Sequence, residues 1–415
     1  MKKSLIYACF GTLILSVTSC KPEFSNGPSD IDSWPSDQTI EFKHPGLVHS
    51  NEDFDYVRNK VNAQAQPWYI GYQTLLSSPR AQLNYTPSPV EIIVRTANGG
   101  NYGRVANDGA AAYQLALVWK ITGNSQYAEA SINVLNKWAQ TCKGISREDG
   151  HRLLVAGFCG YQYANAAELM RDYSGWKKED FTKFKTWIVE VFYPHCYEFL
   201  GDHYNTPAEQ TWLSWDLPAM LTVLSIGVLC DDSEKVNFAL NYFYNGAGPG
   251  CIKNMVVAMH ADPAGKVKGL NLGQSQEMGR DQAHATLDVP LLGYFCQTAK
   301  NIGVDLFSYD KNKILALCEY TAKYNVNPDQ AVVMPYTPYL SLKEGWHNEI
   351  SNELRGRARP GWELIYNQYA NVMGLEAPYS KEFAAKMRPE NGGAQGGEQD
   401  DLGFGTLMYT RVPKN

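Results

Sequence analysis

Four chemically active side chains follow one another at helical spacing in the segment QSQEMGRDQAH: they are Glu277, Arg280, Asp281 and His284. Their i, i+3, i+4 and i+7 spacing predicts that all of them lie on one face of a helix. The residues that follow, LDVPLLGYFC, are almost entirely apolar, so this helix is expected to continue into a core. Asp281 also suits the N-cap of a helix that begins there. A polar cluster at the mouth of a buried helix is a candidate site.

Other segments supply groups that could complete such a site. The segment GDHYNTPAEQTWLSWD offers His203, Tyr204, Asn205, Gln210, Trp212 and Trp215. One of its two tryptophans is expected in the core, and the other is expected to stack on a sugar ring. Further candidates are His260 in HADPAGKVKG, Tyr336 and Tyr339 in VVMPYTPY, and Arg359 in RGRARPGW.

These residue types suit β-elimination on a uronic acid polymer. The reaction needs a donor that neutralises the C5 carboxylate, a base that removes the C5 proton and an acid that protonates the departing O4. The expected donors are Arg280 with Asn205 or Gln210, the expected bases His284 or His203, and the expected acids Tyr204 or Tyr336. The expected substrate-binding side chains are Glu277, Gln210, Trp212, Trp215, His260, Tyr336 and Arg359.

Hydrolysis by two carboxylates is the alternative chemistry for the same residues. The carboxylates that could form such a pair are Asp108, Asp216, Glu277 and Asp281. The sequence has no HExxH motif and no dense His–Asp cluster at the spacing of metal ligands. We therefore expect neither a metal site nor a redox cofactor.

The composition indicates a globular protein and not a disordered one. Of 415 residues, 44% are hydrophobic and 19% are charged, which is typical of a folded chain. The net charge of −6 argues against nucleic acid as a partner, so an acidic polysaccharide would have to meet local basic residues. Most of the seven cysteines after Cys20 are expected to be buried, and one or two disulfides remain open.

The N-terminus predicts export. The start MKKSLIYACFGTLILSVTSC has a basic beginning and an apolar run too short to span a bilayer as a permanent helix. Its end, VTSC, resembles a bacterial lipobox, which implies cleavage before Cys20 and lipidation of that thiol. We expect a signal peptide at residues 1–19, a tether at residues 20–43 and one catalytic domain at residues 44–415. The membrane would be a partner only through lipidated Cys20, in the periplasm or on the outer-membrane surface.

Paired helical patterns dominate the rest of the chain. In each complete pair, which begin near residues 108, 152, 212 and 281, the first helix is apolar all round and the second is amphipathic. An all-round apolar helix is an inner helix and an amphipathic helix is an outer one. The pattern predicts an all-α fold, an α/α toroid or incomplete barrel of about five to seven helix pairs. Loops 95–108, 150–161, 201–215 and 268–284 should then gather at one mouth, where function usually collects.

Several of these motifs together resemble the alginate-lyase-like family of polysaccharide lyases from Bacteroidota. The motifs are Trp-x-x-Trp-Asp, IGVLCDD, NYFYNGAG, GQSQEMGRDQAH and EYTAKYN, with HPGLVHSNEDFDYVRNKV at the front. The resemblance covers about residues 44–374. It implies an α/α toroid that cleaves a uronate polysaccharide such as alginate, and it carries over best to Glu277, Arg280 and His284.

The chain departs from the family pattern at two places. Gln210 stands where the family has a His, and Ser214 stands where it has an Asn. The departure indicates that His203 and Asn205 take over, or that the substrate has changed. It also motivates the second alternative, a non-catalytic surface lipoprotein that binds glycans.

Overall fold

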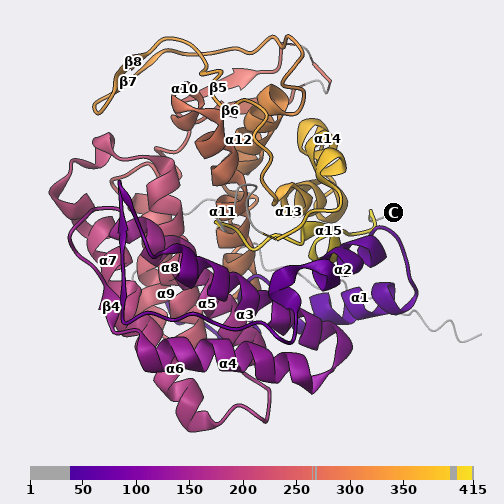
Figure 1. Ribbon diagram of the computed structural model, residues 1–415. Helices are drawn as coiled ribbons and strands as arrows, with labels where there is room; N and C mark the ends of the chain where they lie inside the picture. The colour runs from indigo at the N-terminus through magenta and orange to yellow at the C-terminus, as the bar shows by residue number, and fades with distance from the viewer. Residues whose placement is uncertain (1–37, 264, 267–268, 393–399, 414–415) are drawn as a thin grey trace, which may run out of the picture.

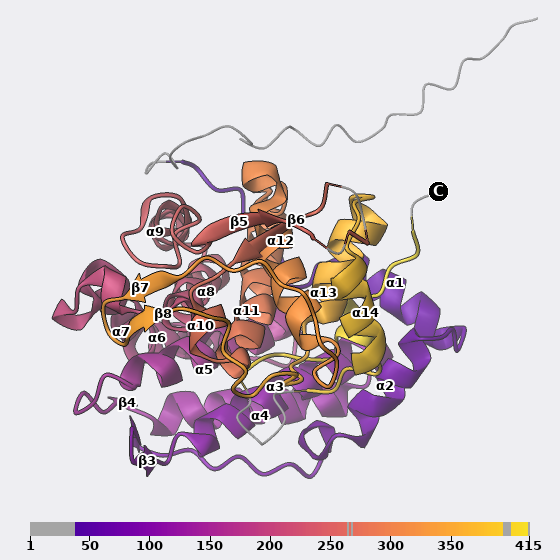
Figure 2. The same ribbon diagram turned by 90° about the horizontal axis from the view of Figure 1, so that it is seen from above.

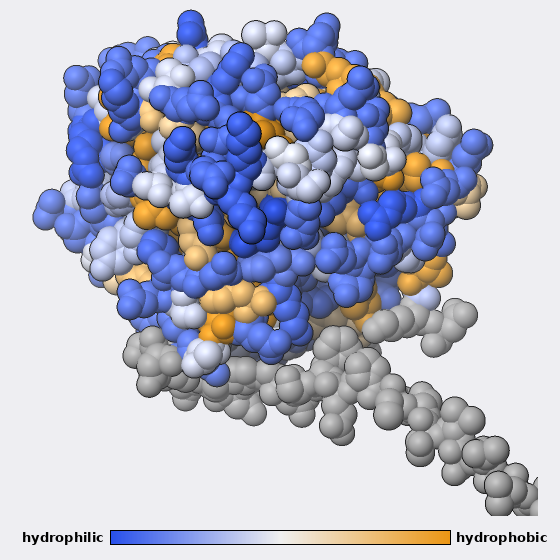
Figure 3. All heavy atoms as spheres, turned by 90° about the horizontal axis from the view of Figure 1, so that it is seen from below, coloured by the Kyte–Doolittle hydropathy of each residue, from blue (hydrophilic) through white to orange (hydrophobic). Residues whose placement is uncertain are grey.

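The computed structural model describes residues 38–263, 265–266, 269–392 and 400–413. The expected signal peptide, Cys20 and most of the expected tether lie outside these residues. The described helices and strands form a ring of helices with small two-stranded sheets at its periphery (Figure 1). One face seen in Figure 3 is mainly hydrophilic with scattered apolar side chains, as expected for a globular surface.

Four long apolar helices form the inner layer. They are α3 (Gly103–Thr122), α5 (Arg152–Met170), α8 (Leu213–Cys230) and α11 (Gln282–Asn301). Each packs against the next in this order, and nearly all of their side chains are buried. Helix α8 is long and apolar enough to cross a membrane, but 89% of it is buried inside the protein, so its apolar surface serves the core.

Amphipathic helices cover the inner layer from outside. They are α4 (Ser125–Thr141), α6 (Lys178–Val191) and α9 (Ser233–Asn245), and each buries one face against the inner helices. This arrangement confirms the predicted α/α toroid. Where one long helix was expected over residues 179–200, the chain forms α6 and then α7 (Tyr193–Asp202), with Pro194 at the start of the second helix.

The fourth pair differs from the predicted pattern. Helix α12 (Tyr309–Asn325) is buried on almost every side and not only along one face. It packs against α11, against the strand β6 (Asn271–Gln274) and against α14 (Pro378–Met387) (Figure 2). These neighbours cover the outer face of α12, whereas the outer faces of α4, α6 and α9 are exposed to solvent.

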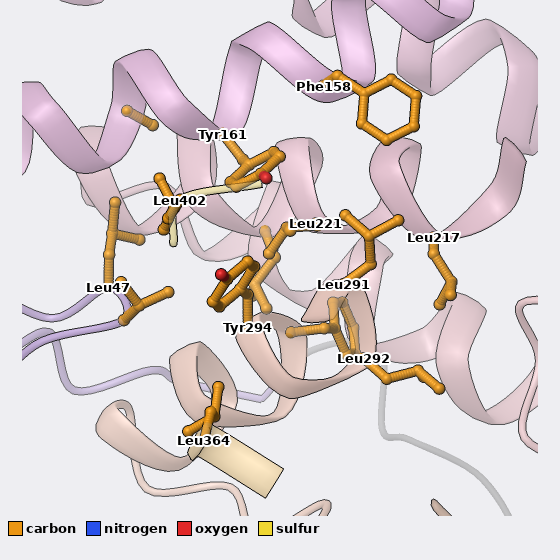
Figure 4. Close-up of a cluster of buried hydrophobic side chains, with 14 of the residues drawn as sticks. Leu47, Phe158, Tyr161, Leu217, Leu221, Leu291, Leu292, Tyr294, Leu364 and Leu402 are labelled. Atoms are coloured by element: carbon orange, nitrogen blue, oxygen red, sulfur yellow. The ribbon is translucent and has the colours of Figure 1, made fainter. Parts of the chain in front are cut away.

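The first and last helices of the described chain meet and complete the ring. Helices α1 (Asn51–Asn62) and α2 (Trp68–Ser77) contact α3, and the short α15 (Gly405–Met408) contacts α1, α2 and α13 (Trp362–Tyr366). A π-helix over Asn367–Val372 continues α13. Figure 4 shows Leu47 and Leu402 beside the rings of Tyr161 and Tyr294 in the core. Tyr161 donates its hydroxyl to the Asp400 carbonyl at 2.6 Å, which ties the C-terminal segment to α5.

The sequence did not reveal the four small sheets. These pair β1 (Ile92–Ile93) with β4 (Gly144–Ile145), β2 (Arg95–Thr96) with β3 (Gly99–Gly100), β5 (Ala258–Ala261) with β6, and β7 (Tyr339–Ser341) with β8 (Gly345–His347). Strands of two to four residues are too short to show an alternating pattern. Single-turn 3-10 helices occur at Pro79–Ala81, His203–Asn205 and Ala208–Gln210.

The seven cysteines from Cys142 to Cys318 are all free in the described part of the chain. Six of them are buried and Cys230 is partly exposed, so they fill space among apolar neighbours as expected.

Candidate functional site

Two adjoining cavities open at the mouth of the ring. The smaller, about 230 Å³, is called the basic pocket and is lined by Arg95, Tyr102, Leu154, Phe158, Ser214, Trp215, Ala283, His284, Leu287, Leu354, Arg357, Arg359 and Asp400. The larger, about 700 Å³, is called the groove and is lined by Gly150, Arg152, Glu198, Phe199, Asp202, His203, Tyr204, Asn205, Thr206, Gln210, Thr211, Trp212, Trp215 and Lys343. The loops that lead into the four inner helices all contribute to these walls. Their predicted gathering at one mouth is therefore confirmed.

The segment QSQEMGRDQAH does not form one helix. Glu277–Arg280 make a single turn, α10, and α11 begins at Gln282, because Asp281 between them is extended with φ −165° and ψ 162°. The predicted single stripe of four side chains is therefore wrong, whereas the predicted N-cap at Asp281 is confirmed. The cap explains the break, since an N-cap residue cannot keep helical angles while its side chain binds the first turn.

Asp281 orients the imidazole of His284. One carboxylate oxygen accepts the His284 amide at 2.9 Å, and the other lies 2.6 Å from Nδ1 of the same residue. A carboxylate only accepts, so Nδ1 carries the proton and Nε2 keeps its lone pair. Burial acts to raise the pKa of Asp281, but the hydrogen bonds and charge of His284 and the charge of Arg280 lower that pKa overall. The His284 side chain is 35% exposed and lines the basic pocket.

Glu277 is buried and the Arg280 side chain is 19% exposed, and neither residue lines the two cavities. The Glu277 carboxylate is wholly buried, accepts the Ser214 amide at 3.0 Å and lies 3.3 Å from the Arg280 guanidinium. That guanidinium also stacks on the ring of Trp212 at 4.6 Å. The two residues fix the start of α8 against α10. Substrate binding by Glu277 does not fit its burial, whereas neutralisation of a uronate carboxylate by Arg280 stays a prediction, because the Arg280 side chain is partly exposed beside Ser214.

The expected base His203 and the expected acid Tyr204 line the groove, and Nε2 of His203 and the hydroxyl of Tyr204 are both engaged within the protein. Nε2 of buried His203 lies 3.0 Å from the Tyr242 hydroxyl and 3.4 Å from Asp216. Tyr204 donates its hydroxyl to the His195 carbonyl at 2.8 Å, and its ring lies 3.7 Å from the guanidinium of Arg152. Burial raises the pKa of Tyr204 well above its usual value. These contacts direct the Tyr204 hydroxyl and Nε2 of His203 to the protein and not to a sugar.

Asn205 and Gln210 also lie in the groove, both reachable from solvent. The two tryptophans divide as expected. Trp212 is 3% exposed and belongs to the core beneath Arg280, whereas Trp215 is partly exposed and lines both cavities.

The other three expected binding residues, His260, Tyr336 and Arg359, lie in different places. His260 pairs with the Gln274 side chain at 3.0 Å across β5 and β6, outside both cavities. Tyr336 donates to the His347 carbonyl at 3.3 Å, and burial raises its pKa to about 12, so it too faces the protein. Arg359 does line the basic pocket. It donates to the Ala283 carbonyl at 3.1 Å and pairs with Asp400 at 3.1 Å.

The four carboxylates proposed for hydrolysis do not form an accessible pair. Asp108, Asp216 and Glu277 are buried at or below 1% exposure, and Asp281 is 8% exposed. Asp108 accepts Tyr85, Ser88 and Trp138, and Asp216 accepts Tyr242 and Gly250. All of them hold the scaffold together, so the geometry gives no support to the hydrolytic alternative.

Sequence reasoning missed several residues that line the two cavities, among them Arg95, Tyr102, Arg152 and Lys343. Arg95 and Tyr102 flank the β2–β3 turn and line the basic pocket, and the Arg95 guanidinium lies 4.5 Å from the centre of the Tyr102 ring. The sequence did place the loop over residues 95–108 at the mouth, but periodicity cannot say which of its side chains point inward. In the described residues, no three His, Cys, Asp or Glu side chains gather as metal ligands would.

The fold and the site define an α/α toroid with a basic cavity at its mouth. A sequence model of the alginate lyase family matches residues 75–331, so the chain belongs to this family and is a polysaccharide lyase. No curated protein matches the sequence.

Solved structures share the fold at low sequence identity. A variant of alginate lyase A1-III complexed with a tetrasaccharide has a TM-score of 0.64 and 17% identity, over 92% of this chain and 99% of that one. The A1-III enzyme from Sphingomonas species A1 has a TM-score of 0.59 and 16% identity, over 89% and 99%. An alginate lyase from Bacteroides ovatus has a TM-score of 0.57 and 12% identity, over 89% and 100%.

Proposed function

We propose that this lyase cleaves a uronic acid polymer, alginate first, by β-elimination in the basic pocket. The observation that carries the proposal is the oriented imidazole of His284 in a cavity that three guanidinium groups also line. The tetrasaccharide complex of the related A1-III enzyme supports an acidic polysaccharide as the substrate.

The carboxylate of the reacting uronate would bind among the guanidinium groups. Arg359 is already paired with Asp400, whereas Arg95 makes no ion pair with any described acidic residue and reaches the pocket from the β2–β3 turn. We assign the main contact to Arg95, because a bidentate guanidinium–carboxylate pair withdraws charge and makes the C5 proton more acidic. This assignment puts Arg95 ahead of Arg280.

His284 Nε2 would then remove the C5 proton. The electron pair of the C5–H bond forms the C4–C5 double bond, and the C4–O4 bond breaks. The developing imidazolium is stabilised by Asp281, which already accepts the Nδ1 proton.

The departing O4 needs a proton, and Tyr102 brings a phenol hydroxyl, more acidic than that of Ser214, to the cavity that His284 lines. We assign it as the acid, in place of Tyr204 and Tyr336. Transfer of the proton from His284 to Tyr102 through water returns both groups to their starting state.

The test is digestion of alginate, glucuronan, pectate and glycosaminoglycans, followed by mass spectrometry of the products. Elimination gives products lighter by one water molecule than those of hydrolysis. We expect such products from at least one polymer, strong loss of turnover in His284→Gln and in Tyr102→Phe, and a raised KM in Arg95→Ala. Products that have gained water, or His284→Gln with native turnover, would contradict the proposal. Binding without any product would instead favour a glycan-binding role.

We also propose that the chain is exported and held at a membrane through lipidated Cys20. The basic start and the VTSC motif support this. Metabolic labelling with palmitate should mark the native chain and not Cys20→Ala, and an unlabelled native chain would refute the proposal.

A further inference from the structure

The two cavities differ in size and meet at one side chain. The basic pocket has a volume of about 230 Å³ and the groove a volume of about 700 Å³, and among the described residues Trp215 alone lines both. At about 30 Å³ per water molecule, the basic pocket holds the equivalent of about eight waters, which suits a single sugar ring. The groove has room for several.

The basic pocket has a buried floor. Leu154, Phe158, Ala283 and Leu287 are each less than 10% exposed, and so is the ion pair of Arg359 with Asp400. Walls from α5, α8 and α11 and from the segment before α13 surround this floor. The groove continues from Trp215 toward Arg152 and Lys343, whose ammonium group lies 5.9 Å from the Trp215 ring.

Charge differs between the two cavities as well. Among the described residues, three guanidinium groups line the basic pocket against one carboxylate, that of Asp400, which is paired with Arg359. In the groove two cations face two carboxylates, and one of these, Glu198, is bound by Arg147 at 2.8 and 2.9 Å. The strongest attraction for a uronate carboxylate therefore lies in the cavity that holds one ring.

Elimination fixes which ring this is. The sugar that loses the C5 proton also loses its bond to O4, so it lies on the reducing-end side of the cleaved bond. This sugar must place its C5 beside His284 in the basic pocket, and the sugar on the other side of the bond lies toward Trp215 and the groove.

We infer that the basic pocket accepts only the last uronate unit at the reducing end of the chain, while the groove binds the units before it. The enzyme thus shortens the polymer from its reducing end and releases an unsaturated monouronate at each step. This inference rests on the proposed elimination reaction in the basic pocket.

The experiment uses the full chain and oligouronates of three to eight units. These are prepared from the polymer that the enzyme cleaves fastest. One set carries tritium at C1 of an intact reducing-end ring, and a second carries a bulky aminobenzamide there. We expect the tritium to appear first in a one-unit product. We expect the aminobenzamide to slow cleavage at least tenfold, because the pocket cannot hold it, and polymer viscosity to fall slowly relative to the number of bonds cut.

Label in products of several units, or a steep early fall in viscosity, would overturn the inference and leave the elimination reaction standing. Products that have gained water would overturn both. Lys343→Ala tests the groove: its loss of kcat/KM should grow with chain length. Lys178→Ala, on the exposed surface of α6, is the matched control and should match the native enzyme at each length. A loss in Lys343→Ala that is the same at every length would contradict the placement of the chain in the groove.

Discussion

The carboxylate of Asp281 binds His284 twice: it accepts the backbone amide at a distance of 2.9 Å and ring Nδ1 at a distance of 2.6 Å. One residue thus starts helix α11 and selects the tautomer of the imidazole at its first turn. Cap and base are therefore coupled, so the helix cannot fray at this end without moving the proposed base.

Asp281→Asn separates these two roles. Asn is as good an N-cap as Asp, so the free energy of unfolding should change little. Its amide group would donate to Nδ1, move the ring proton to Nε2 and remove the base. We expect kcat to fall roughly 100-fold or more while KM stays near the native value. Asp281→Ser, which keeps a cap but gives the ring no carboxylate, should also lose kcat. Native turnover in Asp281→Asn would show that the tautomer is irrelevant.

Arg280 should behave as a scaffold residue. Its removal leaves the buried Glu277 carboxylate without its cation and takes the guanidinium off the Trp212 ring. Breaking a buried pair from one side costs about 3 kcal/mol or more, so Arg280→Met should lower the denaturant midpoint clearly. The double variant Glu277→Gln with Arg280→Met should recover part of this loss, because no buried charge is left unpaired. A large change in KM without a change in stability would show instead that Arg280 binds the substrate.

The sequence predicted the fold through its inner helices and failed at individual side chains. Helix α8 is apolar on every side, which indicates an inner helix in any context. Spacing alone could not tell that Asp281 interrupts the stripe, because i, i+3 and i+4 relations are the same within a helix and across a cap. Nor could it predict that the Tyr204 hydroxyl donates to the His195 carbonyl. That contact depends on the left-handed backbone at His203 and Tyr204.

The same limit applies to the basic pocket. Arg95 and Tyr102 belong to a loop that the toroid pattern did place at the mouth, but a loop has no period from which to read direction. Which arginines face the cavity became clear only from packing. Arg359 lies on its floor, whereas Arg355 turns to the carbonyls of Tyr324 and Gln330.

Glu319 should make stability fall as pH rises. Burial raises the pKa of its carboxyl to about 7, against the opposing hydrogen bonds from Tyr379 and Ser380. A pKa above the ordinary value of 4.5 means that the folded state holds a proton which the unfolded state has lost. This stabilising contribution is complete below pH 4.5 and is lost as the pH rises through 7. We expect the free energy of unfolding of Glu319→Gln to depend less on pH over this window than that of the native chain. Glu179→Gln, at an exposed position of α6, is the control and should keep the native slope.

Gly157 sets the distance between two inner helices that carry the site. A Cβ atom there would lie 2.9 Å from Cβ and 3.0 Å from the backbone carbon of Pro218, so α5 and α8 would have to move apart. Overpacking of this kind costs about 1–3 kcal/mol. Because α5 and α8 carry Phe158 and Trp215 into the basic pocket, Gly157→Ala should lower both the melting temperature and kcat/KM. Gly201→Ala in α7, where a Cβ would meet no atom within 4 Å, is the matched control: it should leave kcat/KM unchanged and should not lower the melting temperature, since alanine favours a helix over glycine. Equal melting temperatures for the two variants would mean that the α5–α8 contact can relax without cost.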